Sequence, residues 1–201
     1  VKDLNEILNI RHIPDYSKNG LQVKGSDDVK RIALAVDASF ETIKKAKSEN
    51  CDFIIVHHGL FWKDVRDILG LRKAKIEFLK KNKMSLYAAH LPLDLHNEFG
   101  NNIRLAKLLS LKDLSPFRKC EKLKIGFSGK LQKAISLNKL ANILNKKLKT
   151  KCIIQKNSKK LIKTVAIVSG GAGDMIYETS KNKIDCLITG EAKHNQIIDA
   201  K

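Results

Sequence analysis

The sequence predicts an α/β fold made of two duplicated βαβ-type lobes, with mostly parallel sheets and a metal site between the lobes. Apolar, strand-like runs alternate with segments whose apolar residues recur at helical spacing, as is typical of parallel sheets covered by helices. In addition, 31–59 and 163–191 share one order of strand, small-residue turn, amphipathic helix, aspartate and short apolar strand. Duplication is the simpler explanation of this repeat, although any two βαβ units resemble each other.

The elements of the first lobe follow from its apolar pattern. The run RIALAVDAS is rich in strand formers, and the next segment carries Phe40, Ile43 and Ala46 at helical spacing. The same reasoning predicts strands at 31–39, 52–58 and 85–90, and helices at 40–50, 73–83 and 101–111. We therefore expect the first lobe to occupy residues 1–111.

The second lobe is expected over residues 124–201. A charged segment that contains a proline, KDLSPFRKCEK, precedes it and makes 112–123 the expected linker. Strands are predicted at 124–130, 152–155, 164–169 and 185–189, and helices at 136–148, at 174–182 and from Glu191 onwards.

Composition limits the classes of partner. The chain has 201 residues and a net charge of +18, but only six of its 39 basic residues are arginines. Reading bases or clamping phosphates favours arginine, so lysines spread along the chain predict no more than weak, salt-sensitive attraction to nucleic acids. Four scattered cysteines without a C-x-x-C spacing suit reduced thiols in a cytoplasmic protein. No apolar stretch approaches the ~20 residues of a membrane span, so we expect no membrane association.

Three polar clusters follow predicted strands. They are His57-His58-Gly59, HLPLD at 90–94 and TGEAKH at 189–194. In open α/β sheets, ligands bind at the carboxyl ends of the strands. Neutral imidazole and carboxylate together suit Zn²⁺, Fe²⁺ or Mn²⁺. A single histidine is more often a core or surface residue, but a histidine pair that ends one strand, beside a His/Asp cluster that ends the next, favours a metal site.

Four segments sharpen this interpretation. NGLQV (19–23), DFIIVHHGLFW (52–62), AAHLPLDLHNEFGNN (88–102) and LITGE (187–191) occur in this order. Together they resemble the dinuclear metal centre hexameric proteins, also called GTP cyclohydrolase 1 type 2 homologues or Nif3-like proteins, in their short bacterial form. The resemblance covers nearly the whole chain. It implies a cytoplasmic homo-oligomer, a ring of six, that binds two divalent metal ions such as Zn, Fe or Mn.

The resemblance also implies roles for individual residues. His57 and His58 match metal ligands in the HHG motif, and Asp94 matches a carboxylate ligand in HLPLD. His90 matches a histidine beside the metals that faces the substrate or supports a ligand, and Glu191 matches an acidic position near the same pocket, so these two are the catalytic candidates. His96 is expected in a loop.

One departure from the family pattern bears on the metal site. Members of the family close the site with a late H-x-x-x-E segment that supplies two more ligands, whereas His194 is the one histidine or glutamate that follows Glu191 here. The resemblance therefore implies a second lobe that is truncated at its end and a site with too few ligands for two firmly held ions. Activity and tight metal binding are expected to need residues beyond Lys201.

Two functions remain open from the sequence. The first is a metal-dependent hydrolase that acts on a nucleotide, similar to GTP cyclohydrolase, in which two ions share a bridging hydroxide. The glycine-rich turn SGGAGD (169–174) could cradle a phosphate, although close packing explains such a turn equally well. The alternative is a non-catalytic, metal-bearing hexameric ring that binds a protein partner or nucleic acid.

Overall fold

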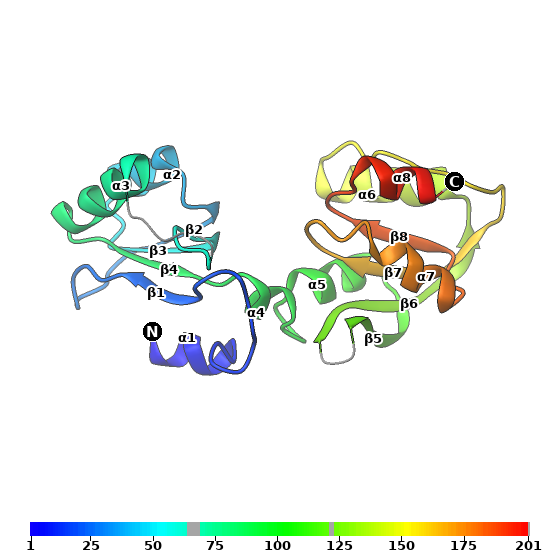
Figure 1. Cartoon of the computed structure of the whole chain (residues 1–201), viewed down its shortest axis with the longest axis horizontal. Coiled ribbons are helices and arrows are strands. Elements are labelled where there is room, and N and C mark those ends of the chain that lie inside the picture. Colours follow the sequence, from blue (N-terminus) through cyan, green and yellow to red (C-terminus); the bar gives the residue numbers. More distant parts are fainter. Residues whose placement is uncertain (64–68, 121–122, 201) are drawn as a thin grey trace. The chain divides into compact units, whose positions relative to one another are not determined.

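The computed structural model describes residues 1–63, 69–120 and 123–200 (Figure 1). The chain divides into two compact units, Val1–Leu93 and Asp94–Lys201, which we call the N-terminal unit and the C-terminal unit. Each unit contains a four-stranded sheet with helices packed on it. The predicted α/β class is therefore confirmed.

The sheet of the N-terminal unit has the strand order β1-β4-β3-β2. Its strands are β1 (Gly20–Val23), β2 (Ile32–Asp37), β3 (Phe53–His58) and β4 (Ser85–Ala88). β2, β3 and β4 run parallel to one another, whereas β1 pairs antiparallel to β4. Because the carboxyl ends of parallel strands meet at one edge of a sheet, the residues that end or follow these three strands are brought together.

Helices cover both faces of this sheet. α2 (Phe40–Ser48) and α3 (Gly70–Lys81) pack on one face, and the segment of α1 (Lys2–Ile7) packs on the other. Alternation along β3 explains this division, because Ile54 belongs to the α2/α3 core cluster and Phe53 belongs to the α1 cluster. Ser39 fixes the start of α2, since its hydroxyl oxygen accepts a hydrogen bond from the Thr42 amide at 2.9 Å.

The strand β2 differs from the rest of this sheet because one of its faces is exposed. Ala33 and Ala35 pack against the α2/α3 core. The alternating residues Ile32, Leu34 and Val36 are exposed, and Leu34 keeps 78% of its surface in contact with solvent. β2 is also the last strand in the order of the sheet. It is therefore an edge strand with an apolar outer face.

The sheet of the C-terminal unit has the strand order β5-β6-β7-β8. Its strands are β5 (Lys112–Cys120), β6 (Leu123–Ile135), β7 (Ile162–Val168) and β8 (Cys186–Thr189). β7 and β8 are parallel, as predicted, whereas β5/β6 and β6/β7 are antiparallel. The sheets were predicted to be mostly parallel, but in this unit parallel pairing is limited to β7 and β8.

The helices of the C-terminal unit also pack on both faces of its sheet. α5 (Asn101–Leu108) and α6 (Leu137–Leu148) share a core with β7, and α7 (Met175–Lys181) packs on the opposite face. α8 (His194–Asp199) follows β8. Across the described residues of both units, no helix has the length and apolar composition that crossing a membrane requires.

The internal repeat corresponds to two βαβ units, β2–α2–β3 and β7–α7–β8. In each, an aspartate that precedes the second strand accepts two backbone hydrogen bonds at the start of the first strand. Asp52 Oδ2 accepts from the amides of Lys30 and Arg31 at 2.9 and 3.1 Å. Asp185 Oδ2 accepts from the amides of Lys163 and Thr164 at 3.0 and 2.9 Å. In both βαβ units, the aspartate therefore links the residue before the second strand to the start of the first strand.

Two predictions about individual segments differ from the structure. The expected linker, 112–123, is mostly the strand β5, and the two compact units meet in sequence at Leu93 and Asp94; residues 121–122 lie outside the described residues. Pro116 suggested a break, but β5 is the last strand in its sheet, where a residue without an amide hydrogen is tolerated. The strand expected at 152–155 is irregular chain in the structure.

Candidate metal centre

Three histidines meet at the carboxyl edge of the N-terminal sheet. His57 and His58 end β3, and His90 follows β4. One ring nitrogen of each lies within 4.8 Å of the others, so together they can hold a metal ion. The ring centroids of His57 and His58 are 4.6 Å apart, and those of His57 and His90 are 4.9 Å apart. His90, expected beside the metals, thus belongs to the same potential ligand group as the two histidines of the HHG motif.

The end of β3 allows two adjacent histidines to share one site. The pairing of β3 with β4 ends at Val56 and Ala88, so His57 and His58 lie beyond that ladder, although His58 still pairs with Asp37 of β2. Gly59 then turns the chain. A Cβ atom at Gly59 would clash with the side chain of Gln22, which cannot yield easily because its Oε1 accepts the Leu60 amide at 2.7 Å.

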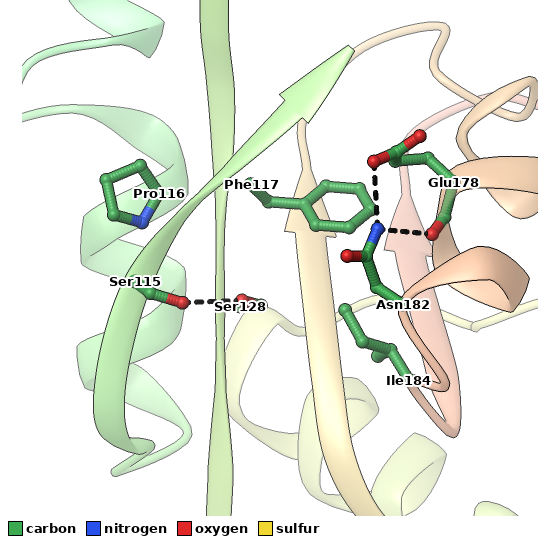
Figure 2. A pocket seen from close by; sticks show the side chains of 7 residues that line it. All are labelled: Ser115, Pro116, Phe117, Ser128, Glu178, Asn182 and Ile184. Atoms are coloured by element: carbon green, nitrogen blue, oxygen red, sulfur yellow. Dashed lines mark hydrogen bonds between the residues drawn. The ribbon is translucent and has the colours of Figure 1, made fainter.

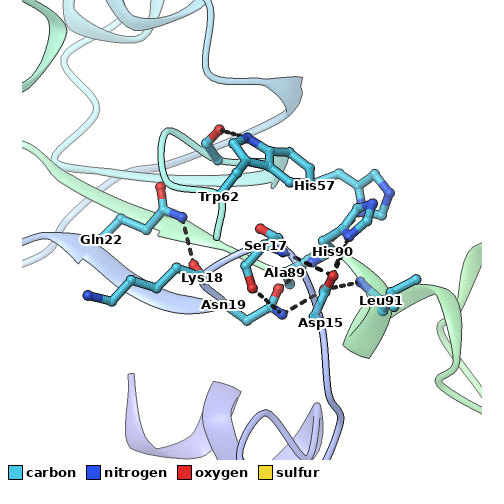
Figure 3. Close-up of polar contacts among 11 residues, drawn as sticks. Asp15, Ser17, Lys18, Asn19, Gln22, His57, Trp62, Ala89, His90 and Leu91 are labelled. Atoms are coloured by element: carbon cyan, nitrogen blue, oxygen red, sulfur yellow. Dashed lines mark hydrogen bonds and ion pairs between the residues drawn. The ribbon is translucent and has the colours of Figure 1, made fainter. Parts of the chain in front are cut away.

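Each of the three histidines is oriented by a hydrogen bond at Nδ1. Figure 3 shows two of them, His57 and His90, together with Ala89 and Asp15. His57 Nδ1 lies 2.9 Å from the carbonyl oxygen of Ala89. His58 Nδ1 lies 2.7 Å from Oδ1 of Asp37, and His90 Nδ1 lies 3.0 Å from Oδ1 of Asp15. A carbonyl or an ionised carboxylate can only accept, so Nδ1 carries the hydrogen in each ring. In a neutral imidazole the lone pair then falls on Nε2, the arrangement that metal-binding histidines ordinarily show.

The carboxylate that orients His90 is itself fixed in place. The side chain of Asp15 is 2% exposed. Burial raises its pKa, but hydrogen bonds from His90, Asn19, and the amides of Ser17 and Leu91 outweigh this and lower the pKa to about 2. Asp15 is therefore ionised at neutral pH. Its fixed negative charge favours the Nδ1–H form of His90 and strengthens that ring as a ligand.

A tryptophan forms one wall of the histidine group. The Trp62 ring lies 5.1 Å from the ring of His90 and 6.1 Å from the ring of His58, measured between centroids. Its backbone forms a β-bridge with Ser17, and its Nε1 donates to the Gly59 carbonyl at 3.2 Å. These contacts link the segments around Ser17 and Trp62 and place the indole ring beside His58 and His90.

Asp94 and Glu191 lie in the C-terminal unit. Asp94 is buried, and its Oδ1 accepts hydrogen bonds from Asn101 Nδ2 at 2.7 Å and from Ser169 Oγ at 2.9 Å. Glu191 follows β8, and its side chain lies beside Gly171. The carboxylate of Asp94 therefore has a defined orientation, as a ligand or a structural acceptor requires.

The remaining histidines have local roles. His96 lies in a loop, as expected, where its Nδ1 accepts the amides of Glu98 and Phe99, each at 3.1 Å. His12 is exposed and bonds to Asn9. His194 opens α8. These residues serve as controls for the three histidines of the metal centre.

The sequence interpretation did not find Asp15, Asp37 and Trp62. Asp37 ends the strand next to β3, so the rule that brings strand ends together could have found it. Asp15 and Trp62 lie in segments without a strand or helix pattern, and their positions depend on contacts between loops.

The C-terminal unit contains a pocket (Figure 2). Its volume is about 330 Å³, and it lies between β5, β6 and α7. Ser115 and Ser128 bond to each other at 2.9 Å, and Asn182 donates to the carbonyl and the carboxylate of Glu178, both at 2.8 Å. Because these polar groups bond to one another, the histidine group remains the better candidate.

Comparison with known proteins places this chain in a family. A model of the family described as Duf34/NIF3 (NGG1p interacting factor 3) matches residues 1–201. A protein of Pyrococcus abyssi called GTP cyclohydrolase 1 type 2 homolog is 45% identical over 96% of this chain and 78% of its own length. A protein of the same name from Deinococcus radiodurans is 38% identical over 100% of this chain and 76% of its own length.

Solved structures of similar proteins have the same fold. A protein titled ybgI, of unknown function, superposes with a TM-score of 0.90 at 33% identity, covering 99% of this chain and 79% of that one. The protein TTHA1606 from Thermus thermophilus superposes with a TM-score of 0.86 at 37% identity, with the same coverage. These likenesses extend over both units and include the segments that carry His57, His58 and His90. The chain belongs to the DUF34/NIF3 family, as the resemblance of its motifs had implied.

Proposed function

We propose that this protein is a metal-dependent hydrolase whose metal centre includes His57, His58 and His90. The observation that supports this proposal is the shared orientation of the three rings, each with an acceptor at Nδ1. Three imidazoles fit Zn²⁺, Fe²⁺ or Mn²⁺, and three protein ligands leave coordination positions for water and substrate.

A divalent ion bound here would supply Lewis acidity and a water molecule of lowered pKa. The residues of the chain prepare this chemistry. Asp15 and Asp37 hold the tautomers of His90 and His58, and the Ala89 carbonyl does the same for His57. Trp62 places its indole ring beside His58 and His90.

Two further acidic residues complete the proposal. The family resemblance implies a second ion and implies Asp94 as a carboxylate ligand of the metal site. Hydrogen bonds from Asn101 and Ser169 to Asp94 Oδ1 would hold that carboxylate for binding. Glu191 is proposed to transfer protons to and from the substrate.

The proposed substrate is a nucleotide. The relatives carry the name GTP cyclohydrolase 1 type 2 homolog, so GTP is the first compound to test. We also propose a homo-oligomer, a ring of six in the cytoplasm, on the basis of the family resemblance. Light scattering at micromolar concentration tests the assembly, and a stable monomer would contradict it.

The decisive experiment combines metal analysis with turnover. The protein expressed from its complete natural reading frame is stripped with a chelator, reloaded with Zn²⁺, Mn²⁺ or Fe²⁺, and incubated with GTP while ring opening is followed by absorbance and product analysis. We expect turnover only after reloading, and loss of both metal and turnover in His57→Ala, His58→Ala and His90→Ala. The control His96→Ala should keep both.

The outcomes separate the two functions left open by the sequence. Metal bound by the wild-type protein and lost from the three histidine variants, without turnover of any nucleotide, would favour the non-catalytic ring that binds a partner. Unchanged metal content in all three variants, with a lowered melting temperature, would reduce the histidines to packing residues and end the proposal.

A further inference from the structure

The positive charge of this protein is concentrated in the C-terminal unit. Residues 122–173 contain 13 lysines and no Asp, Glu or Arg, so they carry 13 of the 18 net positive charges. Lysines occur along the whole chain, as the sequence interpretation held, but the acidic residues that balance them elsewhere are missing from this stretch. Lysines are therefore spread along the chain, but the net positive charge is not, because residues 122–173 lack acidic residues.

The densest part is residues 146–163, which we call the basic segment. It contains eight lysines and comprises the end of α6, the loop drawn in yellow in Figure 1, and the start of β7. All eight lysines are exposed. Among the described residues, Lys160 is the one lysine of the segment in an ion pair, with Asp185 at 2.7 Å. The positive potential of the segment is thus largely uncompensated by nearby carboxylates.

The basic segment also exposes apolar side chains. Leu148, Ile153, Ile154 and Leu161 are all exposed, and Ile153 keeps 95% of its surface in contact with solvent. The loop is fixed at the end of α6, because the Asn145 side chain accepts the Cys152 amide at 2.6 Å. The isoleucines therefore project from an anchored loop, between lysines that precede and follow them.

We propose that the basic segment is a docking surface for membranes that contain anionic phospholipids. Lysines near such a surface are attracted by its negative potential, and this attraction falls off within a Debye length. Apolar side chains among them can enter the boundary between head groups and acyl chains, which adds burial to the electrostatic attraction. This peripheral contact needs no spanning helix, and it replaces the expectation of no membrane association.

Nucleic acid is the competing partner, and the side chains of the segment disfavour it. Its phosphates would be attracted by the same lysines. However, residues 128–176 contain no Arg and no Phe, Tyr or Trp, so the segment offers neither a bidentate phosphate clamp nor a platform for stacked bases. Binding to nucleic acid would also leave the exposed Ile153 without a role.

Sedimentation of the full chain with lipid vesicles tests this proposal. Vesicles of phosphatidylcholine alone are compared with vesicles that also contain phosphatidylserine, at low and at high salt. We expect binding to the anionic vesicles at low salt, and binding to the neutral ones that is weaker by about tenfold or more. The triple variant Lys149→Gln/Lys151→Gln/Lys156→Gln should weaken binding about tenfold or more, and Ile153→Ser should weaken it without changing the net charge.

A matched control separates the basic segment from bulk charge. The variant Lys45→Gln/Lys80→Gln/Lys81→Gln removes the same three charges from exposed positions in the N-terminal unit and should bind the vesicles as the wild-type protein does. Thermal melts confirm that every variant is folded. Equal losses in the two triple variants would overturn the proposal, because bulk charge would then explain the binding.

A nucleic acid arm completes the experiment. Binding of the wild-type chain to a DNA duplex and to a single-stranded oligonucleotide is measured at the same salt. Vesicle binding that is sensitive to Ile153→Ser supports the proposal. Tighter binding to DNA than to vesicles, with no effect of Ile153→Ser on either, would assign the surface to nucleic acid and overturn the proposal.

Discussion

The two βαβ units of this protein have the same backbone arrangement but carry different side chains at the carboxyl end of the second strand. In β2–α2–β3 and in β7–α7–β8, an aspartate joins the second strand to the start of the first, 21 residues earlier in both cases. Counted from these aspartates, His58 and Glu191 occupy the same position, although His58 is the last residue of β3 and Glu191 follows the end of β8. The first βαβ unit places a potential metal ligand there, and the second places a carboxylate beside glycines.

The position of each strand in its sheet accounts for this difference. β3 is an inner strand, so loops from both of its parallel neighbours reach its carboxyl end: β4 is followed by His90, and β2 ends with Asp37. β8 is an edge strand and has a parallel neighbour, β7, on one side. An inner parallel strand can therefore collect ligands and orienting carboxylates from two loops, whereas an edge strand collects them from one.

Substitution of the two equivalent residues, His58 and Glu191, should give the largest difference between the two βαβ units, measured as bound metal. His58→Ala removes a direct ligand and is expected to lower metal affinity by at least about 100-fold, since even the loss of supporting groups costs about 10–100-fold. Glu191→Gln, at the equivalent position, should keep the metal and lower turnover. Elemental analysis of both variants checks this. Loss of metal from Glu191→Gln would show that both units supply ligands.

The buried and the exposed orienting carboxylates offer the next contrast. Asp15→Asn should lower metal affinity about tenfold, because a neutral amide holds the His90 tautomer less firmly. Asp37→Asn should have a smaller effect, because the side chain of Asp37 is 64% exposed and water can replace its contact with His58. Competition with a chromogenic chelator measures both affinities. A larger effect of Asp37→Asn would reverse the assigned order of the two carboxylates.

Replacement of Asp52 or Asp185, the equivalent aspartates of the two βαβ units, tests whether this contact stabilises both units equally. Asp185→Ala leaves the amides of Lys163 and Thr164 without their acceptor and should lower the free energy of unfolding by about 2 kcal/mol. Asp52→Ala should cost less, because water reaches the amides of Lys30 and Arg31 more easily. Urea titrations of both variants compare the two losses. Equal losses would mean that exposure does not decide the contribution of this contact.

The charge of Asp185 should also make the free energy of unfolding depend on pH, with a smaller effect than the Asp185→Ala substitution. Burial raises the pKa of Asp185, but hydrogen bonds from Lys160, Thr164 and Lys163 lower it well below its ordinary value. The folded protein therefore binds this proton more weakly than the unfolded chain, whose carboxyl titrates near about pH 4. The contribution of Asp185 is complete above that pH and is lost as the pH falls further.

Urea titrations of the wild-type protein and Asp185→Asn between about pH 3 and pH 6 isolate this contribution. The free energy of unfolding should fall more steeply towards acid in the wild-type protein. Parallel curves for the two proteins would show that Asp185 gains no stability from its charge.

The sequence supported the alternation of strands and helices, the family and the histidine pair, because each depends on local pattern or on motifs. It predicted a linker at 112–123, where the structure has the strand β5, because no local pattern distinguishes a proline in an edge strand from a proline that marks a break. Asp15 was missed for another reason. It reaches His90 across 75 residues of sequence, and that contact exists only once the loops are folded against each other.

The apolar outer face of β2 has a consequence for the solubility of the protein. Ile32, Leu34 and Val36 lie on an edge strand, which is a template for pairing with other chains. The N-terminal unit is synthesised first, and while this face is uncovered the unit is prone to association with other copies of itself. Leu34→Lys would act as a gatekeeper against aggregation during refolding, and it would leave the α2/α3 core untouched because its neighbours Ala33 and Ala35 face that core.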